Sequence, residues 1–355
     1  MSTMPYHFDE LLGRIEPDQE REDIAQEIPD QVRDFLKESE EITTVNPHSR
    51  LAGSYARNTA IKNIKDVDVI LVVHDDYMKE EPERVLNLLF SVLQGLPDAL
   101  DDHGEVVACR HQRRSVQVHL EHKNFDLDIV PAVAPNGVAR ALEIPDKDWE
   151  KWVPTHPLGY GDELSALNSK HQDKVVRLIK LLKHWRDVHL IYRRPKSYWL
   201  ECLIYHKIAC GNVPTDGLAY AEIFRDLLGS IRDGFQDNLK REKVPEISDP
   251  MLGNNVAHNW ELDDFKAFMS RVDESYGWAK RALDTDVSES DSIKLWQKVF
   301  GKDWFPTEVT QQKGENLRAA ISKGSIFVTP DGRVHTETPS VRSVPAPAQR
   351  FYGKD

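Results

Sequence analysis

Four aspartates stand at strand-like spacing in two separate apolar runs. Asp66 and Asp68 alternate with valines at the start of one run, and Asp126 and Asp128 alternate with larger apolar residues in the other. Successive side chains of a strand point to opposite faces, so each pair of acids shares one face and its apolar neighbours share the other. If the two strands are neighbours, three or four carboxylates meet within a small area.

A carboxylate cluster of this kind repels itself unless cations lie in it. Mg²⁺ and Mn²⁺ prefer oxygen ligands, and a pair of such ions about 3.5–4 Å apart needs a bridging set of carboxylates. We therefore expect a site for Mg²⁺ (or Mn²⁺), two ions in all, where the two strands adjoin.

A Gly-Ser pair, Gly53-Ser54, lies shortly before Asp66. Glycine permits close backbone approach, and a following serine with free amides can hold a phosphate. Taken alone, the pair fits an ordinary turn better, and Asp66 and Asp68 fit exposed edge positions. The combination with the second acidic pair favours a phosphate-holding turn followed by a metal-bearing strand.

The first half of the chain contains the elements that must position these residues. Strand-like runs occur at 50–55, 66–73, 105–109, 115–120 and 125–130. The pattern also predicts a helix at 82–93 and another at 17–41 that is interrupted near Pro29. This order is typical of a mixed sheet with helices against one face. Five prolines between 131 and 160 predict a loop-rich crossover.

The second half reads as helical. Apolar residues recur at helical spacing in DKVVRLIKLLKHWRD, and further helices are expected at 198–210, 218–234, 262–283 and 291–300. From Thr329 the composition turns to Pro, Ser and Thr, which is typical of a tail with little core of its own. We expect a core with its N-terminal helix at 1–160, a helical second lobe at 161–328, and a flexible C-terminal tail at 329–355.

Composition limits the class of protein. The formal net charge of −13 argues against a protein whose main task is to hold a long nucleic acid, although a local basic pocket can still bind a nucleotide. Three cysteines have no metal-ligand spacing, which fits a reducing compartment. No secretory segment and no apolar run of about 20 residues is visible. We expect a cytoplasmic protein without a membrane span.

Two sequence patterns carry a resemblance to a known family. The pattern G-S-x(11)-D-V-D, followed by an aspartate before I-V-P, resembles the nucleotidyltransferase superfamily of DNA polymerase beta. VVRLIKLLKHW followed by PKSYWLECLIYH is similar to 2′-5′-oligoadenylate synthase, to cyclic GMP-AMP synthase and to their bacterial relatives, the cGAS/DncV-like nucleotidyltransferases (CD-NTases). The resemblance covers about residues 50–210. It implies an α+β fold: a polymerase-beta-like nucleotidyltransferase core, with a mixed sheet and helices, and a helical lobe that closes the active-site cleft.

The resemblance also implies roles for the residues of the first half. Asp66, Asp68 and Asp128 would hold both divalent ions, and Asp128 would help to deprotonate an attacking hydroxyl. Gly53 and Ser54 would contact phosphate.

In the second half, the resemblance implies nucleotide contacts. Lys183 would reach the donor triphosphate, with Lys180 as the second candidate. Ser197 and Tyr198 fall where the family places donor-nucleotide contacts. Glu201 is expected to be structural.

Two further groups remain outside these assignments. Asp126 has no clear family counterpart and stays a candidate for the surroundings of the metal site. His119 and His122 fit no metal-binding pattern and are interpreted as surface or core histidines.

The implied reaction joins nucleoside triphosphates, ATP among them, into a cyclic oligonucleotide second messenger in bacterial anti-phage defence. A ribose hydroxyl would attack the α-phosphorus of one nucleotide and pyrophosphate would leave. Neither a long nucleic acid nor a membrane is expected as a partner, and an accessory protein would act on the C-terminal tail. The alternatives are a nucleotidyltransferase that modifies a protein or RNA end, and an inactive nucleotide-binding relative, which the presence of all three carboxylates disfavours.

Overall fold

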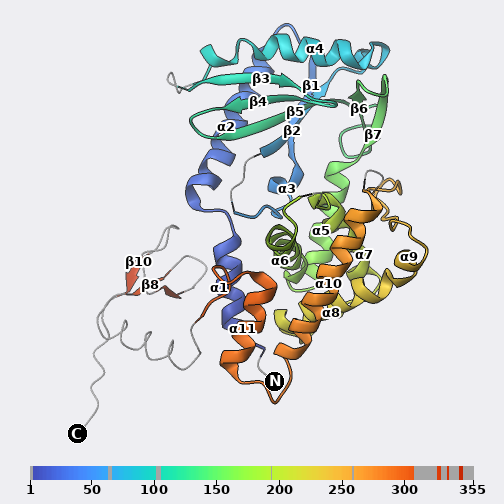
Figure 1. Ribbon diagram of the computed structural model, residues 1–355. Helices are drawn as coiled ribbons and strands as arrows, with labels where there is room; N and C mark the ends of the chain where they lie inside the picture. The colour runs from blue at the N-terminus through green and yellow to red at the C-terminus, as the bar shows by residue number, and fades with distance from the viewer. Residues whose placement is uncertain are drawn as a thin grey trace.

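The computed structural model describes residues 3–62, 66–100, 105–192, 194–257 and 260–307, together with three short strands of the tail. A β-sheet with its covering helices lies at one end of the molecule, and a bundle of helices lies at the other (Figure 1). The mixed sheet followed by helices confirms the expected α+β architecture. No helix among the described residues is both long and apolar enough to cross a membrane.

The central sheet has the strand order β1-β2-β5-β4-β3. Its strands are β1 (Thr44–Ala52), β2 (Asp66–Val73), β3 (Val107–His111), β4 (Val116–Leu120) and β5 (Phe125–Val133). β2 and β5 run parallel to each other, and the other pairings are antiparallel. The expected strands at 66–73, 115–120 and 125–130 are confirmed, and the two strands that carry the acidic pairs are direct neighbours. The runs expected at 50–55 and 105–109 overlap β1 and β3 only in part, because β1 ends at Ala52 and the chain turns into a short helix at Gly53.

The loop-rich crossover expected at 131–160 is wrong in part. β5 continues through Pro131 to Val133, and the hairpin of β6 (Leu142–Asp146) and β7 (Lys151–Thr155) extends the sheet. β7 pairs only with β6, so Pro154 lies on an edge strand, where a missing N–H costs little. The prolines of this segment did not mark a loop, because a hairpin at the edge of a sheet tolerates proline.

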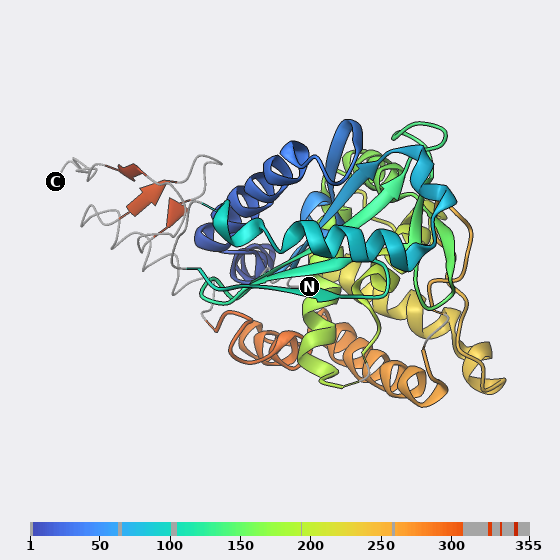
Figure 2. The same ribbon diagram turned by 90° about the horizontal axis from the view of Figure 1, so that it is seen from above.

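One face of the sheet carries the apolar core. α2 (Gln19–Glu38) and α4 (Pro82–Leu93) supply buried residues that pack against the alternate, apolar residues of β2, β4 and β5. Figure 2 shows α4 lying across the strands. The short elements η1 (Asp75–Lys79) and η2 (Leu96–Asp98) lead into and out of this layer.

Pro29 lies inside α2 and does not interrupt it, contrary to expectation. An internal proline costs roughly 3 kcal/mol in an exposed helix. Ala25, Ile28, Val32 and Leu36 of the same helix are buried against the sheet, at about 1.5–3 kcal/mol for each large side chain, so packing offsets that cost.

The opposite face of the sheet is only partly covered. Its apolar part, around Ile70, Val72 and Ala132, packs against the β6–β7 hairpin. The remaining part holds the four aspartates and faces the helical bundle (Figure 1).

The helical bundle surrounds α6 (Lys174–His189), which is buried along most of its length. The other helices are α1 (Pro5–Ile15), α5 (Pro157–Lys170), α7 (Ser197–Ala209), α8 (Tyr220–Gly234), α9 (Gln236–Lys240), α10 (Leu262–Ala282) and α11 (Glu289–Phe300). The helices expected in this half are present to within two residues, and α5 and α9 were not foreseen.

α1 packs with this bundle and not with the sheet. Phe8 makes edge-on ring contacts with Trp296, Phe300 and Phe305 at the other end of the described chain. The expected unit at 1–160 therefore does not describe the first helix, which belongs by its packing to the helical lobe.

In the tail, β8 (Ile326–Val328), β9 (Val334–His335) and β10 (Val344–Ala346) form a small antiparallel sheet. The other residues from 308 onward lie outside the described residues. The expected flexible tail, and the accessory protein acting on it, concern mostly that part of the chain.

Candidate active site

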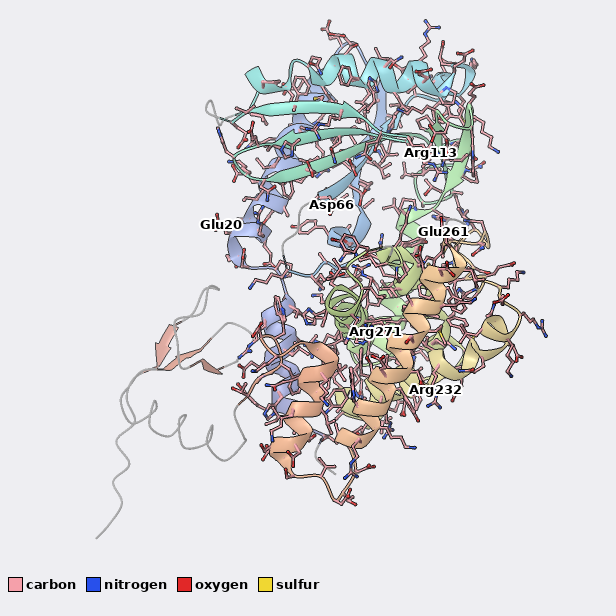
Figure 3. The ribbon with its side chains drawn as sticks, viewed as in Figure 1. Glu20, Asp66, Arg113, Arg232, Glu261 and Arg271 are labelled. Atoms are coloured by element: carbon pink, nitrogen blue, oxygen red, sulfur yellow. The ribbon has the colours of Figure 1, made fainter. Side chains whose placement is uncertain are left out.

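The three expected carboxylates lie together on the sheet. In the register of β2 and β5, Asp66 stands beside Asp126 and Asp68 stands beside Asp128. All four side chains share the face that points towards the helices, where Figure 3 labels Asp66. We call Asp66, Asp68 and Asp128 the carboxylate row. Strand alternation predicted this shared face, and the parallel pairing brings the two acidic pairs together.

The Gly53-Ser54 pair lies directly against this row. Ala52, the last residue of β1, pairs with Asp68, and Gly53 then opens the short helix α3 (Gly53–Ala56). A Cβ built on Gly53 would lie 1.8 Å from Asp68 Oδ2, and its φ of +70° is a left-handed value that favours glycine. Both facts require glycine at this position, so the backbone of the turn approaches the carboxylate as closely as the sequence suggested.

Two of the three carboxylates resist ionisation in the metal-free protein. Burial, followed by the charge of Asp66, raises the pKa of Asp68 to about 6, although Arg57 acts in the opposite direction. Burial, followed by the charges of Asp68 and Asp66, raises the pKa of Asp128 to about 7. No described lysine or arginine forms an ion pair with the row. Asp128 Oδ1 is buried and has no hydrogen-bond partner.

These features fit a divalent cation chemically. The donors are hard carboxylate oxygens, one of them orphaned, and a cation would relieve the repulsion that raises their pKa values. No group of three potential metal ligands was found among the described residues, so the assignment rests on the chemistry of the carboxylate oxygens.

Asp126 has a partner on the neighbouring strand. His119 of β4 stands opposite it, and His119 Nδ1 lies 2.7 Å from Asp126 Oδ1. Asp126 therefore lies beside the row and has a hydrogen-bond partner, whereas Asp128 Oδ1 has none. The interpretation of His119 as an ordinary surface or core histidine overlooked this contact, because no sequence pattern pairs residues on two strands.

Lys183 lies in a buried network with Arg57, Thr59 and Glu201, which we call the Glu201 network. Lys183 Nζ donates to Glu201 Oε1 at 2.7 Å, to Thr59 O at 2.9 Å and to Thr59 Oγ1 at 3.1 Å. Arg57 Nε donates to Glu201 Oε2 at 2.9 Å. Burial works to raise the pKa of Glu201, but the charges of Lys183 and Arg57 outweigh it and hold that pKa below its usual value.

These contacts engage the Lys183 ammonium within the protein, and its role at the donor triphosphate stays a prediction. Its three N–H groups have three protein acceptors, and the residue is only 2% exposed. The expectation that Glu201 is structural agrees with its position at the centre of the network. Arg57 was missed, although it follows the Gly-Ser turn closely and could have been noticed as a cation near that turn.

The remaining nucleotide-binding candidates are also engaged. Lys180 Nζ bonds to Glu16 Oε1 at 3.2 Å and to Asn58 Oδ1 at 3.4 Å. At the start of α7, Ser197 Oγ accepts a hydrogen bond from Arg186. The next residue, Tyr198, donates to Asp249 Oδ2 at 2.8 Å and is half-buried. Its ring lies beside Tyr160 and under the Arg57 guanidinium. Ser197 and Tyr198 stay predictions as nucleotide contacts.

Two surface hollows lie apart from the row. One of about 500 Å³ is lined by Thr43, which precedes β1, and by residues in and around η1 and α4, and one of about 600 Å³ is lined by residues of α7, α8 and α10 with the loop after α7. Neither contains an expected site residue, so the chemistry of the carboxylates, and not the size of a hollow, identifies the site.

Comparison with known proteins finds synthases of cyclic oligonucleotides that are similar to this chain. A model of the Second Messenger Oligonucleotide or Dinucleotide Synthetase domain matches residues 1–168. A cyclic AMP-AMP-AMP synthase from Acinetobacter sp. is 29% identical over 92% of this chain and 94% of its own length. A cyclic AMP-AMP-GMP synthase from Enterobacter hormaechei is 21% identical over 84% of this chain and 91% of its own length.

A solved structure has the same fold. CdnC of Escherichia coli, determined with ATP, superimposes with a TM-score of 0.67 at 16% identity, over 85% of this chain and 98% of CdnC. The same protein has also been solved in a complex named CdnC:HORMA-deltaN. Members of this family generally use divalent metals and nucleoside triphosphates. These similarities confirm the resemblance to the cGAS/DncV-like nucleotidyltransferases and support a nucleotidyltransferase that synthesises a cyclic oligonucleotide second messenger.

Proposed function

We propose that this nucleotidyltransferase uses ATP as a substrate, joins it into a cyclic trinucleotide of AMP units, and does so on two Mg²⁺ or Mn²⁺ ions held by Asp66, Asp68 and Asp128. The choice of adenine follows the cyclic AMP-AMP-AMP synthase that matches this chain over 92% of its length. The choice of site rests on one observation: Asp128 Oδ1 is buried without a partner beside Asp68, and Asp68 is pressed against the Gly53 backbone.

The residues of the site divide the work of one transfer. Gly53 and Ser54 hold the triphosphate of the donor nucleotide, because only a glycine leaves room for phosphate and backbone beside Asp68. Asp128 Oδ1 receives a hydrogen bond, and then the proton, from the attacking ribose hydroxyl. The new bond joins that oxygen to the α-phosphorus, and the bond from the α-phosphorus to the leaving oxygen of pyrophosphate breaks. Divalent cations, when bound, supply positive charge that favours the ionised hydroxyl and the departing pyrophosphate.

Repeating this step lengthens the nucleotide, and an attack by its own terminal hydroxyl closes the ring. The helical lobe supports the turn that holds the donor, since the Glu201 network ties Arg57 and Thr59 to α6 and α7. The network therefore holds the turn in a fixed position relative to the helical lobe.

Incubation of the purified chain with each nucleoside triphosphate and Mg²⁺ or Mn²⁺ tests the proposal. After phosphatase treatment, mass spectrometry should find a phosphatase-resistant product with the mass of three AMP units when ATP is supplied. A resistant product that requires another nucleotide would overturn the choice of adenine alone. Label transferred to a macromolecule, or unchanged ATP with every metal, would overturn the synthase reaction.

A further inference from the structure

The open face of the sheet continues beyond the carboxylate row onto β4 and β3. Gln117 stands opposite Asp128, His119 stands opposite Asp126, and Arg110 stands opposite Gln117. The alternate residues of β4 are fully buried in the core beneath α2 and α4, so Gln117 and His119 must point to the same face as the acids. The row therefore has a polar extension on the β4 side.

His119 is oriented on this extension with one nitrogen unused. A carboxylate oxygen accepts hydrogen bonds, so the contact of 2.7 Å with Asp126 Oδ1 fits the tautomer of His119 that carries its hydrogen on Nδ1. In that tautomer the other ring nitrogen, Nε2, is a lone-pair acceptor, and no described residue bonds it. About 28% of the His119 side chain is exposed. A cross-strand pair accounts for the contact with Asp126, but not for the free acceptor beside the row.

The strand order shows on which side of the carboxylate row His119 Nε2 lies relative to the Gly-Ser turn. Gly53 and Ser54 follow β1, on one side of β2 and β5, whereas His119 lies on β4, on the other side. In a phosphoryl transfer the attacking and leaving oxygens lie roughly in line on opposite sides of the phosphorus. If the triphosphate leaves on the β1 side, the acceptor nucleotide must approach from the β4 side.

We propose that His119 Nε2 accepts a hydrogen bond from the acceptor nucleotide, namely from the ribose hydroxyl next to the one that attacks. Asp126 is the positioning residue that fixes the imidazole. This inference rests on the proposed function, because it uses Gly53 and Ser54 as the triphosphate side and Asp128 as the partner of the attacking hydroxyl. His119 and Asp128 are diagonal neighbours on adjacent strands, a separation of about 7–8 Å or somewhat less, so one ribose could contact both side chains.

The test separates the two nucleotides of one transfer. 2′,3′-Dideoxy-ATP can only donate, and α,β-methylene-ATP can only accept, so with Mg²⁺ the pair yields a linear dinucleotide whose formation is measured against each concentration. The acceptor is also supplied in its 2′-deoxy and 3′-deoxy forms. Whichever of these still reacts lacks the non-reacting hydroxyl.

In the wild type, loss of that hydroxyl should lower kcat/KM for the acceptor about tenfold, the usual effect of one hydrogen bond. His119→Phe should lower kcat/KM for the complete acceptor by a similar factor and remove the difference between complete and deoxy acceptors. The KM for the donor should not change. His119→Gln, which keeps an acceptor atom, should retain part of the difference, and Asp126→Asn should reduce it.

His122→Gln is the matched control, since His122 is an exposed histidine in the turn after β4. It should behave as the wild type. A deoxy penalty that persists undiminished in both His119 variants, or a donor KM that rises together with the acceptor KM, would overturn the role of His119 and leave the proposed function standing. A wild type that forms no dinucleotide would overturn the proposed function and this inference with it.

Discussion

The carboxylate row and the Glu201 network are two acidic groups with opposite charge compensation. Glu201 is fully buried, yet its two oxygens receive hydrogen bonds from Lys183, Thr59 and Arg57. Asp128 has one buried oxygen with no partner, and its neighbours on the row are further acids. Both carboxylates are shielded from water, but the pKa of Glu201 lies below its usual value and the pKa of Asp128 lies above it.

The difference shows where each group obtains its positive charge. The Glu201 network contains its own cations and is complete within the chain, so its effect is to hold the lobe and the Gly-Ser turn together. The carboxylate row pairs with no described cation and can be completed only from outside. A buried acid with internal partners is structural, and a buried acid without them indicates a binding site.

The largest effect is expected on the row. Asp66→Asn together with Asp68→Asn should reduce product formation at least about thousandfold, because carboxylate charge is needed to bind divalent cations that supply several kcal/mol of transition-state stabilisation. The fold should survive, since neither side chain forms an ion pair with a described residue. Product yield and circular dichroism measure the two quantities. Asp75→Asn, in η1 beyond the opposite end of β2, is the control and should remain active; turnover retained in the double variant would contradict the site.

The second effect concerns stability. Glu201→Ala leaves Lys183 and Arg57 buried without their shared partner, and loss of one member of a buried ion pair costs about 3–5 kcal/mol. Denaturant unfolding should show this loss in the free energy of unfolding. Glu163→Ala, whose contact is a 3.3 Å bond from Tyr205 on the surface of the bundle, is the control and should change stability little. A Glu201 variant as stable as the wild type would remove the distinction between the two groups.

Lys183→Met distinguishes the two roles of this lysine. Glu201 keeps Arg57 and Thr59 as partners, so the loss of stability should be smaller, about 1.5–3 kcal/mol. The KM for ATP should stay near that of the wild type, because the three N–H groups already have protein acceptors. Lys180→Met, which loses two longer bonds, is the comparison. An unchanged stability combined with a raised KM would support the triphosphate role implied by the resemblance.

The face of each aspartate was predictable, and the partner of Lys183 was not. Period-two alternation places Asp66 and Asp68 on one face whatever the strand pairs with. Lysine in LLKHW has the same type and spacing whether it meets a phosphate or a carboxylate. Glu201 lies on another helix, and only the packing of α6 on α7 brings the two together.

Breaks in the chain were harder to predict than periodic elements. The helix at 82–93 matches α4 because its apolar residues repeat at helical spacing. Pro29 and the prolines after residue 130 were interpreted as breaks, yet α2 and the β6–β7 hairpin contain them. Local preference predicts a break at proline, but burial against the sheet and a position on an edge strand override it.

The smallest effect expected concerns Asp128, and its sign is unusual. Its pKa of about 7 and that of Asp68, about 6, are above the usual 3.8, so the folded protein binds these protons more tightly than the unfolded chain does. The stability of the metal-free protein should therefore fall as the pH rises from about 4 to about 7, and should level off above that range. Asp128→Asn cannot ionise, and at pH 8 without metal it should be about 1–2 kcal/mol more stable than the wild type, with little difference at pH 4.

With Mg²⁺, the wild type should become more stable than Asp128→Asn at pH 8. At this pH Mg²⁺ stabilises the wild type by mass action, and it should stabilise Asp128→Asn much less, since one ligand is lost. Protons compete for the carboxylates, so the gain in the wild type should shrink as the pH falls below about 7. Thermal unfolding at several pH values, with and without Mg²⁺, measures the effect of pH and the effect of Mg²⁺ on stability. Asp75→Asn should follow the wild type throughout. If metal-free Asp128→Asn were the less stable protein at pH 8, Asp128 would be an internally compensated acid like Glu201, and the contrast between the two groups would not hold.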